Sequence, residues 1–126
     1  MANLPHDHGH HEDMLAMLPG CDAFEVLSDL FHQLSDGSRI RIFWILCHCE
    51  ECVINLSAMM EMSSPAVSHH LKLLKTSGLI VSRREGKEVY YKAADTEQAK
   101  VLHNVIRELV TMSCPNHCDF CHKAEK

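Results

Sequence analysis

The chain has 126 residues, a formal net charge of −5, seven cysteines and eleven histidines. This length suits one domain with short tails. The absence of any run of about 18 apolar residues excludes a membrane span, and residues 1–13 lack the basic and apolar regions of a secretory signal. We therefore expect a cytoplasmic protein with reduced thiols. An odd number of cysteines beside many histidines then indicates metal or redox chemistry.

The charge is unevenly distributed along the chain. Residues 1–22 contain four acidic side chains and no Lys or Arg, whereas residues 57–92 contain six Lys or Arg against three Glu. An acidic protein with a basic middle segment can bind a polyanion through that segment.

Three segments are predicted, beginning with a flexible, His-rich tail over residues 1–21. Its histidines alternate with acidic residues, a composition that either stays solvated or binds metal loosely. The second segment is a folded domain over residues 22–112, and the third is a Cys/His-rich tail over residues 113–126.

Apolar residues at helical spacing predict a first helix over residues 24–34. Asp36 or Ser38 can cap a second helix, which is apolar on most sides and should be central; it ends near residues 47–52. A short third helix covers residues 54–60.

A fourth helix follows after a tight turn. Ser64 suits the N-cap and Pro65 the first helical position, and the helix stops at Gly78. Together with the third helix it forms a helix-turn-helix outline. Two β-like runs, 79–84 and 88–93, then flank a hairpin turn that contains glycine.

The last predicted helix carries apolar residues from Val101 to Met112. Its apolar stripe is wide for a terminal element, which suits either a dimer interface or packing onto its own domain. The fold class is therefore mainly α with a small β-hairpin: about five helices and a two-stranded wing.

The fourth helix has two distinct faces. Val67, Leu71 and Leu74 form a buried stripe, and His70 borders it as a packing residue. The opposite face offers hydrogen-bonding groups and cations, as readers of the DNA major groove require. A basic hairpin follows, so we interpret this face as DNA-binding. The assigned contacts are Ser63, Ser64, Ser68, His69, Lys72 and Lys75 in the helix, and Arg83, Arg84 and Lys87 in the wing.

The sequence SPAVSHHLKLLKTSGLI over residues 64–80 closely resembles the recognition helix of the ArsR/SmtB family of bacterial metal-sensing repressors. The segments LSDGSRIRI (34–42) and RREGKEVYY (83–91) match that family as well. The resemblance covers about residues 24–112. It implies a winged helix-turn-helix homodimer that represses an operator and releases it when an inducer binds, with the first and last helices at the dimer interface.

The first thiol cluster contains Cys47, Cys49 and Cys52. Closely spaced thiolates suit Zn(II), Cd(II), Pb(II), Cu(I) or As(III). If the helix continued, Cys49 and Cys52 would share a face, and Cys47 would be a core residue. The sequence ECVINL resembles the family's metal box ELCVCDL, with Cys52 at the first cysteine and Ile54 at the second. Either Cys49 or Cys21 is the candidate replacement for that missing ligand.

The second cluster lies in the C-terminal tail. A short helix starting at Pro115 would bring its three cysteines together with His122 or His117 as a fourth ligand; the alternative is a disordered, metal-free tail. We assign the metal, of unspecified identity, to Cys49, Cys52, Cys114, Cys118, Cys121 and His122. The family's other site, on the last helix, is degenerate here, because Glu97 replaces a histidine and Glu108 and Thr111 replace the second pair.

Three other functions compete with a metal-responsive repressor. A dithiol formed by Cys47 and Cys114 could sense persulfide or oxidants in the same fold. The sequence has no phosphate loop or nucleophile elbow, and its Cys-x2-Cys pairs lack a thioredoxin-like context, which argues against an enzyme. A metal-storage module is the remaining alternative.

Overall fold

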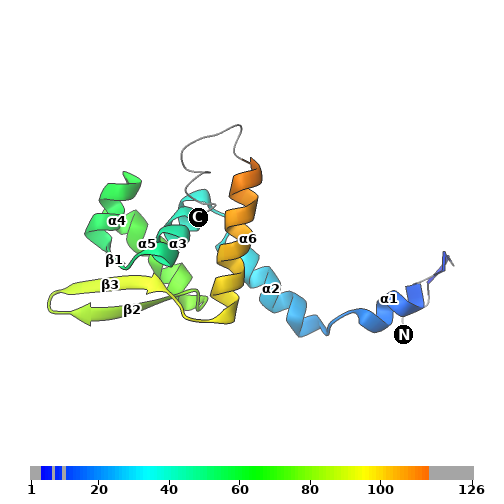
Figure 1. Cartoon of the computed structure of the whole chain (residues 1–126). Coiled ribbons are helices and arrows are strands. Elements are labelled where there is room, and N and C mark those ends of the chain that lie inside the picture. The colour runs from blue at the N-terminus through cyan, green and yellow to red at the C-terminus, as the bar shows by residue number, and fades with distance from the viewer. Residues whose placement is uncertain (1–3, 7, 10, 114–126) are drawn as a thin grey trace.

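The computed structural model describes residues 4–6, 8, 9 and 11–113, and for His11 the backbone only. Figure 1 shows its helices and strands in chain order. They are α1 (His11–Met17), α2 (Cys21–Gln33), α3 (Gly37–His48), β1 (Glu51–Cys52), α4 (Val53–Met60), α5 (Ser64–Thr76), β2 (Ile80–Glu85), β3 (Glu88–Ala93) and α6 (Glu97–Ser113). The five predicted helices are all present as α2 to α6. Helix α1, within the segment expected to be a tail, was not predicted.

Side-chain caps begin the central helices. Asp36 accepts a hydrogen bond from the backbone N–H of Arg39 at 3.0 Å, which confirms it as the cap of α3. Helix α5 is capped by Ser63, whose Oγ accepts from the N–H of Ala66 at 3.3 Å. The prediction that Ser64 is the cap was therefore wrong by one residue, because adjacent hydroxyls both suit this position.

The sheet is antiparallel, with strand order β1-β3-β2. Strands β2 and β3 form the predicted hairpin, and Gly86 in its turn has a φ of 63°, which favours glycine. The wing has three strands rather than two, because Glu51 and Cys52 pair with Tyr91 and Tyr90 of β3. This added strand joins the end of α3 to the base of the wing.

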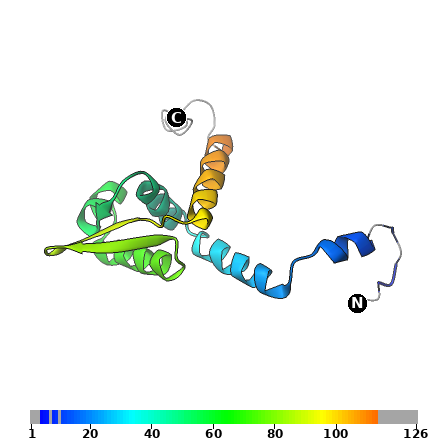
Figure 2. The same cartoon turned by 60° about the horizontal axis from the view of Figure 1, so that its bottom comes forward.

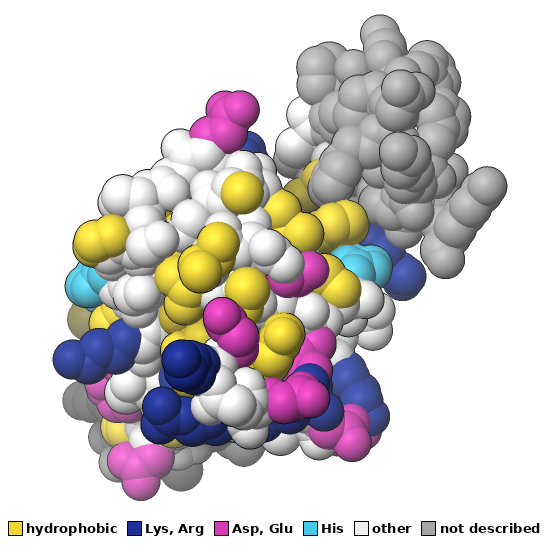
Figure 3. Space-filling view, turned by 90° about the vertical axis from the view of Figure 1, so that its left-hand side faces the viewer, with side chains coloured by type: hydrophobic (Ala, Val, Ile, Leu, Met, Phe, Trp, Pro, Cys, Tyr) yellow, Lys and Arg dark blue, Asp and Glu magenta, His cyan; other side chains and the backbone are white. Residues whose placement is uncertain are grey.

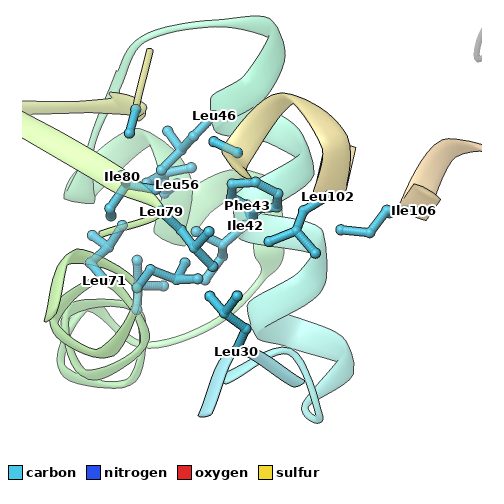
Figure 4. Close-up of a cluster of buried hydrophobic side chains, with 14 of the residues drawn as sticks. Leu30, Ile42, Phe43, Leu46, Leu56, Leu71, Leu79, Ile80, Leu102 and Ile106 are labelled. Atoms are coloured by element: carbon cyan, nitrogen blue, oxygen red, sulfur yellow. The ribbon is translucent and has the colours of Figure 1, made fainter. Parts of the chain in front are cut away.

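Helix α3 is central, as expected. Ile42 and Phe43 are fully buried and contribute to one hydrophobic core with residues of α2, α4, α5, β2 and α6 (Figure 4). Helix α1 and the start of α2 project away from this body (Figure 2). None of the described helices combines the length and apolarity that a bilayer span needs.

Candidate nucleic-acid interface and thiol sites

Helix α5 divides into the two faces that its sequence predicts. Val67, Leu71 and Leu74 are at most 1% exposed and lie in the core. The opposite side chains are exposed to solvent, namely Ser68, His69, Lys72 and Lys75. The core therefore holds the helix and leaves a polar, cationic face outward.

His70 links α5 to α3 instead of facing outward. Its Nδ1 accepts a hydrogen bond from Nε of the buried Arg39 at 3.2 Å, and its Nε2 lies 3.8 Å from a carboxylate oxygen of Asp36. Burial lowers the pKa of His70, while the nearby Asp36 opposes that shift. The prediction that His70 is a packing residue is confirmed. It positions α5 on α3.

The turn before α5 uses both of its serines structurally. Ser63 caps the helix, and the Oγ of Ser64 lies 3.2 Å from the Oγ of Ser57 on α4. Both serines remain exposed, so their hydroxyls also face solvent. This arrangement links the start of α5 to α4.

The three predicted cations of the wing differ in their surroundings. Arg83 is paired with Glu50 (Nη2–Oε1 2.5 Å) and with Glu85 (Nη1–Oε2 2.6 Å), and its guanidinium lies over the ring of Tyr90. These partners raise the pKa of Arg83. Arg84 donates only a long bond of 3.4 Å to the carbonyl of Gly86 among its hydrogen bonds in the described structure. Two carboxylates are thus paired with Arg83, one of the predicted phosphate contacts.

Lysines complete the basic surface. Lys75 donates a 2.7 Å hydrogen bond to the Oγ of Ser82, which ties the end of α5 to β2. Lys72 and Lys87 are exposed. Figure 3 shows Lys and Arg side chains toward the lower edge of the face that includes the wing, with acidic side chains among them. Basic and acidic side chains are mixed on this surface. Attraction of a polyanion would therefore depend on the positions of individual cations more than on the net charge of the surface.

The first thiol cluster is distributed over three environments. Cys47 is half-buried against the core, as expected, and burial raises its pKa to about 12. Cys49 is exposed, and burial followed by the charge of Glu51 raises its pKa. Cys52 is buried in β1. Helix α3 ends at His48, within the predicted range, so the condition for Cys49 and Cys52 to share a helical face is not met.

The cysteine and histidine ligands predicted in the C-terminal tail, Cys114, Cys118, Cys121 and His122, lie outside the described residues. Within the part of the chain that is described, no three His, Cys, Asp or Glu side chains are grouped to hold a metal. The protonated thiol of Cys47 does not favour the dithiol alternative, which needs a thiolate.

Two carboxylates at the start of the last helix, where the family's other site would lie, are paired with a lysine. Lys100 Nζ lies 3.3 Å from Asp95 and 3.9 Å from Glu97, so an ammonium group already neutralises these carboxylates. Sequence reasoning missed a contact between this helix and α3. Nε2 of His103 lies 3.1 Å from Nε2 of His48 on α3. No local spacing signals this contact, because the two residues are 55 positions apart.

A central helix-turn-helix with a β-hairpin wing beside it defines a winged helix-turn-helix protein. Residues 36–82 match the sequence model of a family described as "Bacterial regulatory protein, arsR family". A "Transcriptional repressor SmtB homolog" from Synechocystis is 36% identical over 88 residues, which cover 70% of this chain and 67% of that protein. The chain belongs to this arsR family of transcriptional regulators.

Two further similarities cover the same region. A "Cadmium resistance transcriptional regulatory protein CadC homolog" from Staphylococcus aureus is 40% identical over 77 residues, 60% of this chain and 63% of that one. The solved structure "Reduced HlyU from Vibrio cholerae N16961" superimposes with a TM-score of 0.66 at 26% identity, covering 75% of this chain and 95% of that chain. The family and the fold are those of regulators rather than enzymes.

Proposed function

We propose that the protein is a metal- or metalloid-responsive repressor that binds operator DNA as a homodimer and releases it when a soft or borderline ion binds its cysteines. The observation that carries the DNA-binding role is the outward face of α5, where Ser68, His69 and Lys72 are exposed while the opposite stripe is buried. This face has the donors, acceptors and cations that base edges and phosphates require.

The remaining DNA contacts are proposed around this helix. Ser63 and Ser64 lie at its N-terminus, where backbone N–H groups and hydroxyls suit a phosphate. Lys75, Arg84 and Lys87 extend the contacts toward the wing. Arg83 joins them only when a phosphate replaces one of its carboxylate partners.

The dimer is proposed from the apolar residues that the fold leaves outside the core. Phe24 and Phe31 on α2 are 49% and 58% exposed, and Val105 and Leu109 on α6 are 42% and 55% exposed. A fold whose first core helix and last helix both expose apolar side chains is typical of an obligate dimer. One solved relative in fold is described as a "homodimeric winged helix-turn-helix DNA-binding domain".

The inducer site is proposed at Cys49 and Cys52, with Cys114, Cys118, Cys121 and His122 of the C-terminal tail as further ligands. Thiolates at this density select Zn(II), Cd(II), Pb(II), Cu(I) or As(III) over hard cations. Cys52 is already placed on β1 against the wing, and Cys49 is accessible at the end of α3. A bound ion would supply a charged cross-link between thiolates, and it acts only by binding the DNA-free form more tightly.

We also propose a division of the chain into one domain and two tails. Residues 22–112 form the DNA-binding and dimerisation domain, residues 1–21 a His-rich tail and residues 113–126 a ligand-bearing tail.

Fluorescence anisotropy of labelled operator DNA tests both roles. Lys72→Ala should weaken binding and reduce the slope of log affinity against log salt by about 0.9 per subunit. Lys100→Ala, which removes a lysine paired with Asp95 on another surface, is the matched control and should bind as the wild type.

The same assay tests the inducer. Cd(II) should release the DNA from the wild type, and Cys52→Ser should abolish release while leaving metal-free binding intact. Unchanged salt dependence in Lys72→Ala would contradict the DNA-binding role. Full release in Cys52→Ser would contradict the thiolate site.

A further inference from the structure

The imidazole rings of His48 and His103 meet where the end of α3 passes α6. Their Nε2 atoms are 3.1 Å apart, and the rings are nearly perpendicular, with an interplanar angle of 82° and centroids 4.8 Å apart. His48 is exposed and His103 is half-buried. The two Nε2 atoms share a hydrogen bond and are close enough to bind a single ion, and the exposed His48 leaves the pair open to solvent.

This spacing fits two ligands of one metal ion. Zinc binds imidazole nitrogen at about 2.0–2.1 Å, so two nitrogens 3.1 Å apart subtend about 95–102° at the ion, between octahedral and tetrahedral values. We propose that His48 and His103 form a two-imidazole site for a divalent borderline cation such as Zn(II) or Ni(II). No third His, Cys, Asp or Glu among the described residues joins the pair, so water completes the coordination shell.

The pair is partly enclosed by the fold. His103 is half-buried, and this burial lowers its pKa. The indole of Trp44 packs on His48 with centroids 4.2 Å apart, which restricts the orientation of that ring. A pair of imidazoles that is already positioned needs little reorganisation to bind a cation.

A cation here would join α3 directly to α6. The same helix α6 exposes Val105 and Leu109, the residues assigned above to the dimer interface. The ion would thus fix α6 relative to α3, the helix whose Arg39 contacts His70 of α5. The imidazole site uses none of the cysteines, and it stands whether or not the thiolate site proposed above is correct.

Trp44 is the only tryptophan of the chain and reports on this position. Ni(II) is paramagnetic, so its binding beside His48 should quench Trp44 emission saturably in the reduced, full-length protein without DNA. His103→Gln should lose this quenching, and so should His48→Gln, whose position is exposed and tolerates the change. His32→Gln, at an exposed position on α2, is the control and should titrate as the wild type.

Zn(II) provides the second readout. It should compete with Ni(II) and restore Trp44 emission, because both ions accept the same imidazoles. Circular dichroism of each variant confirms that it is folded. The proposal is overturned if Ni(II) does not change the Trp44 emission of the wild type. It is also overturned if quenching persists in either His48→Gln or His103→Gln. A negative result leaves the DNA-binding and thiolate tests unaffected, since those are measured on operator release.

Discussion

Glu50 restrains a cation of the wing, and removing its charge should strengthen DNA binding. Glu50 accepts hydrogen bonds from Nε and Nη2 of Arg83 at 2.9 and 2.5 Å. In Glu50→Gln the carboxylate charge is lost, and this edge of the guanidinium becomes available to a phosphate. Glu85 still holds Nη1, so the side chain stays near the wing.

The magnitude follows from counterion release. One additional phosphate contact steepens the slope of log affinity against log salt by about 0.9, so a dimer with two wings gains about 1.8. Between about 50 and 200 mM salt the advantage of the variant over the wild type should fall about twelvefold. Stability should change little, because both partners are partly exposed and such ion pairs contribute little to folding.

Anisotropy titrations of operator DNA at several salt concentrations measure this slope. Glu51→Gln is the matched control, because it removes the same charge from the neighbouring residue, whose carboxylate accepts a bond from Asn55 rather than from an arginine. If Glu50→Gln and Glu51→Gln have the same slope, general charge explains the effect. If Glu50→Gln binds more weakly, the carboxylate positions Arg83 for DNA instead of withholding it, and the reasoning fails.

Three other outcomes are expected. Leu71→Ala should lower the free energy of unfolding by about 2–5 kcal/mol in urea titrations, because it opens a cavity beneath the recognition helix; a smaller loss would mean that α5 packs loosely. Leu109→Lys should convert the dimer to monomers in sedimentation experiments while leaving the helical circular dichroism unchanged, and a persisting dimer would exclude α6 from the interface. Because burial lowers the pKa of His70, the unfolded chain binds more protons near pH 6.5. Acidification from pH 8 to about 5.5 should therefore destabilise the wild type more than His70→Gln; equal losses would contradict this.

Local sequence patterns predicted most of the fold. Apolar residues at helical spacing identified α2 to α6, and the polar face of α5 followed from a helical wheel alone. A strand of only two residues, Glu51–Cys52, has no detectable alternation, so β1 was missed, whereas the end of α3 at His48 lies within the predicted range. That strand follows the end of α3, so Cys49 and Cys52 lie outside the helix on which they would have shared a face.

The contacts that define the site were not predictable, because they join distant positions. Arg39 and His70 are 31 residues apart, and Arg83 and Glu50 are 33 apart. Charge counting therefore treated Arg83 as an available cation, whereas two carboxylates hold it in the folded protein. Only the tertiary structure shows which basic residues are already paired.

The added strand provides a short physical route from the thiol site to the wing. Cys52 pairs with Tyr90 across β1 and β3, and the guanidinium of Arg83 lies 4.8 Å from the centre of the Tyr90 ring. If an ion binds Cys52 as proposed, it would therefore act on Tyr90, the residue whose ring contacts Arg83. The hypothesis is that this contact transmits metal binding to the DNA interface.

Tyr90→Ala tests this route because it removes the ring and leaves both thiols in place. Cd(II) should still bind, as thiolate-to-metal absorbance in the ultraviolet shows, while the metal-induced loss of operator affinity should shrink well below the wild-type value. Tyr91→Ala, which removes the neighbouring ring of β3 opposite Glu51, is the control for a general weakening of the strand. If Cd(II) releases DNA from Tyr90→Ala as fully as from the wild type, the coupling runs through another element. The connection of Arg39 and His70 between α3 and α5 would then be the next candidate, since α3 ends beside the same cysteines.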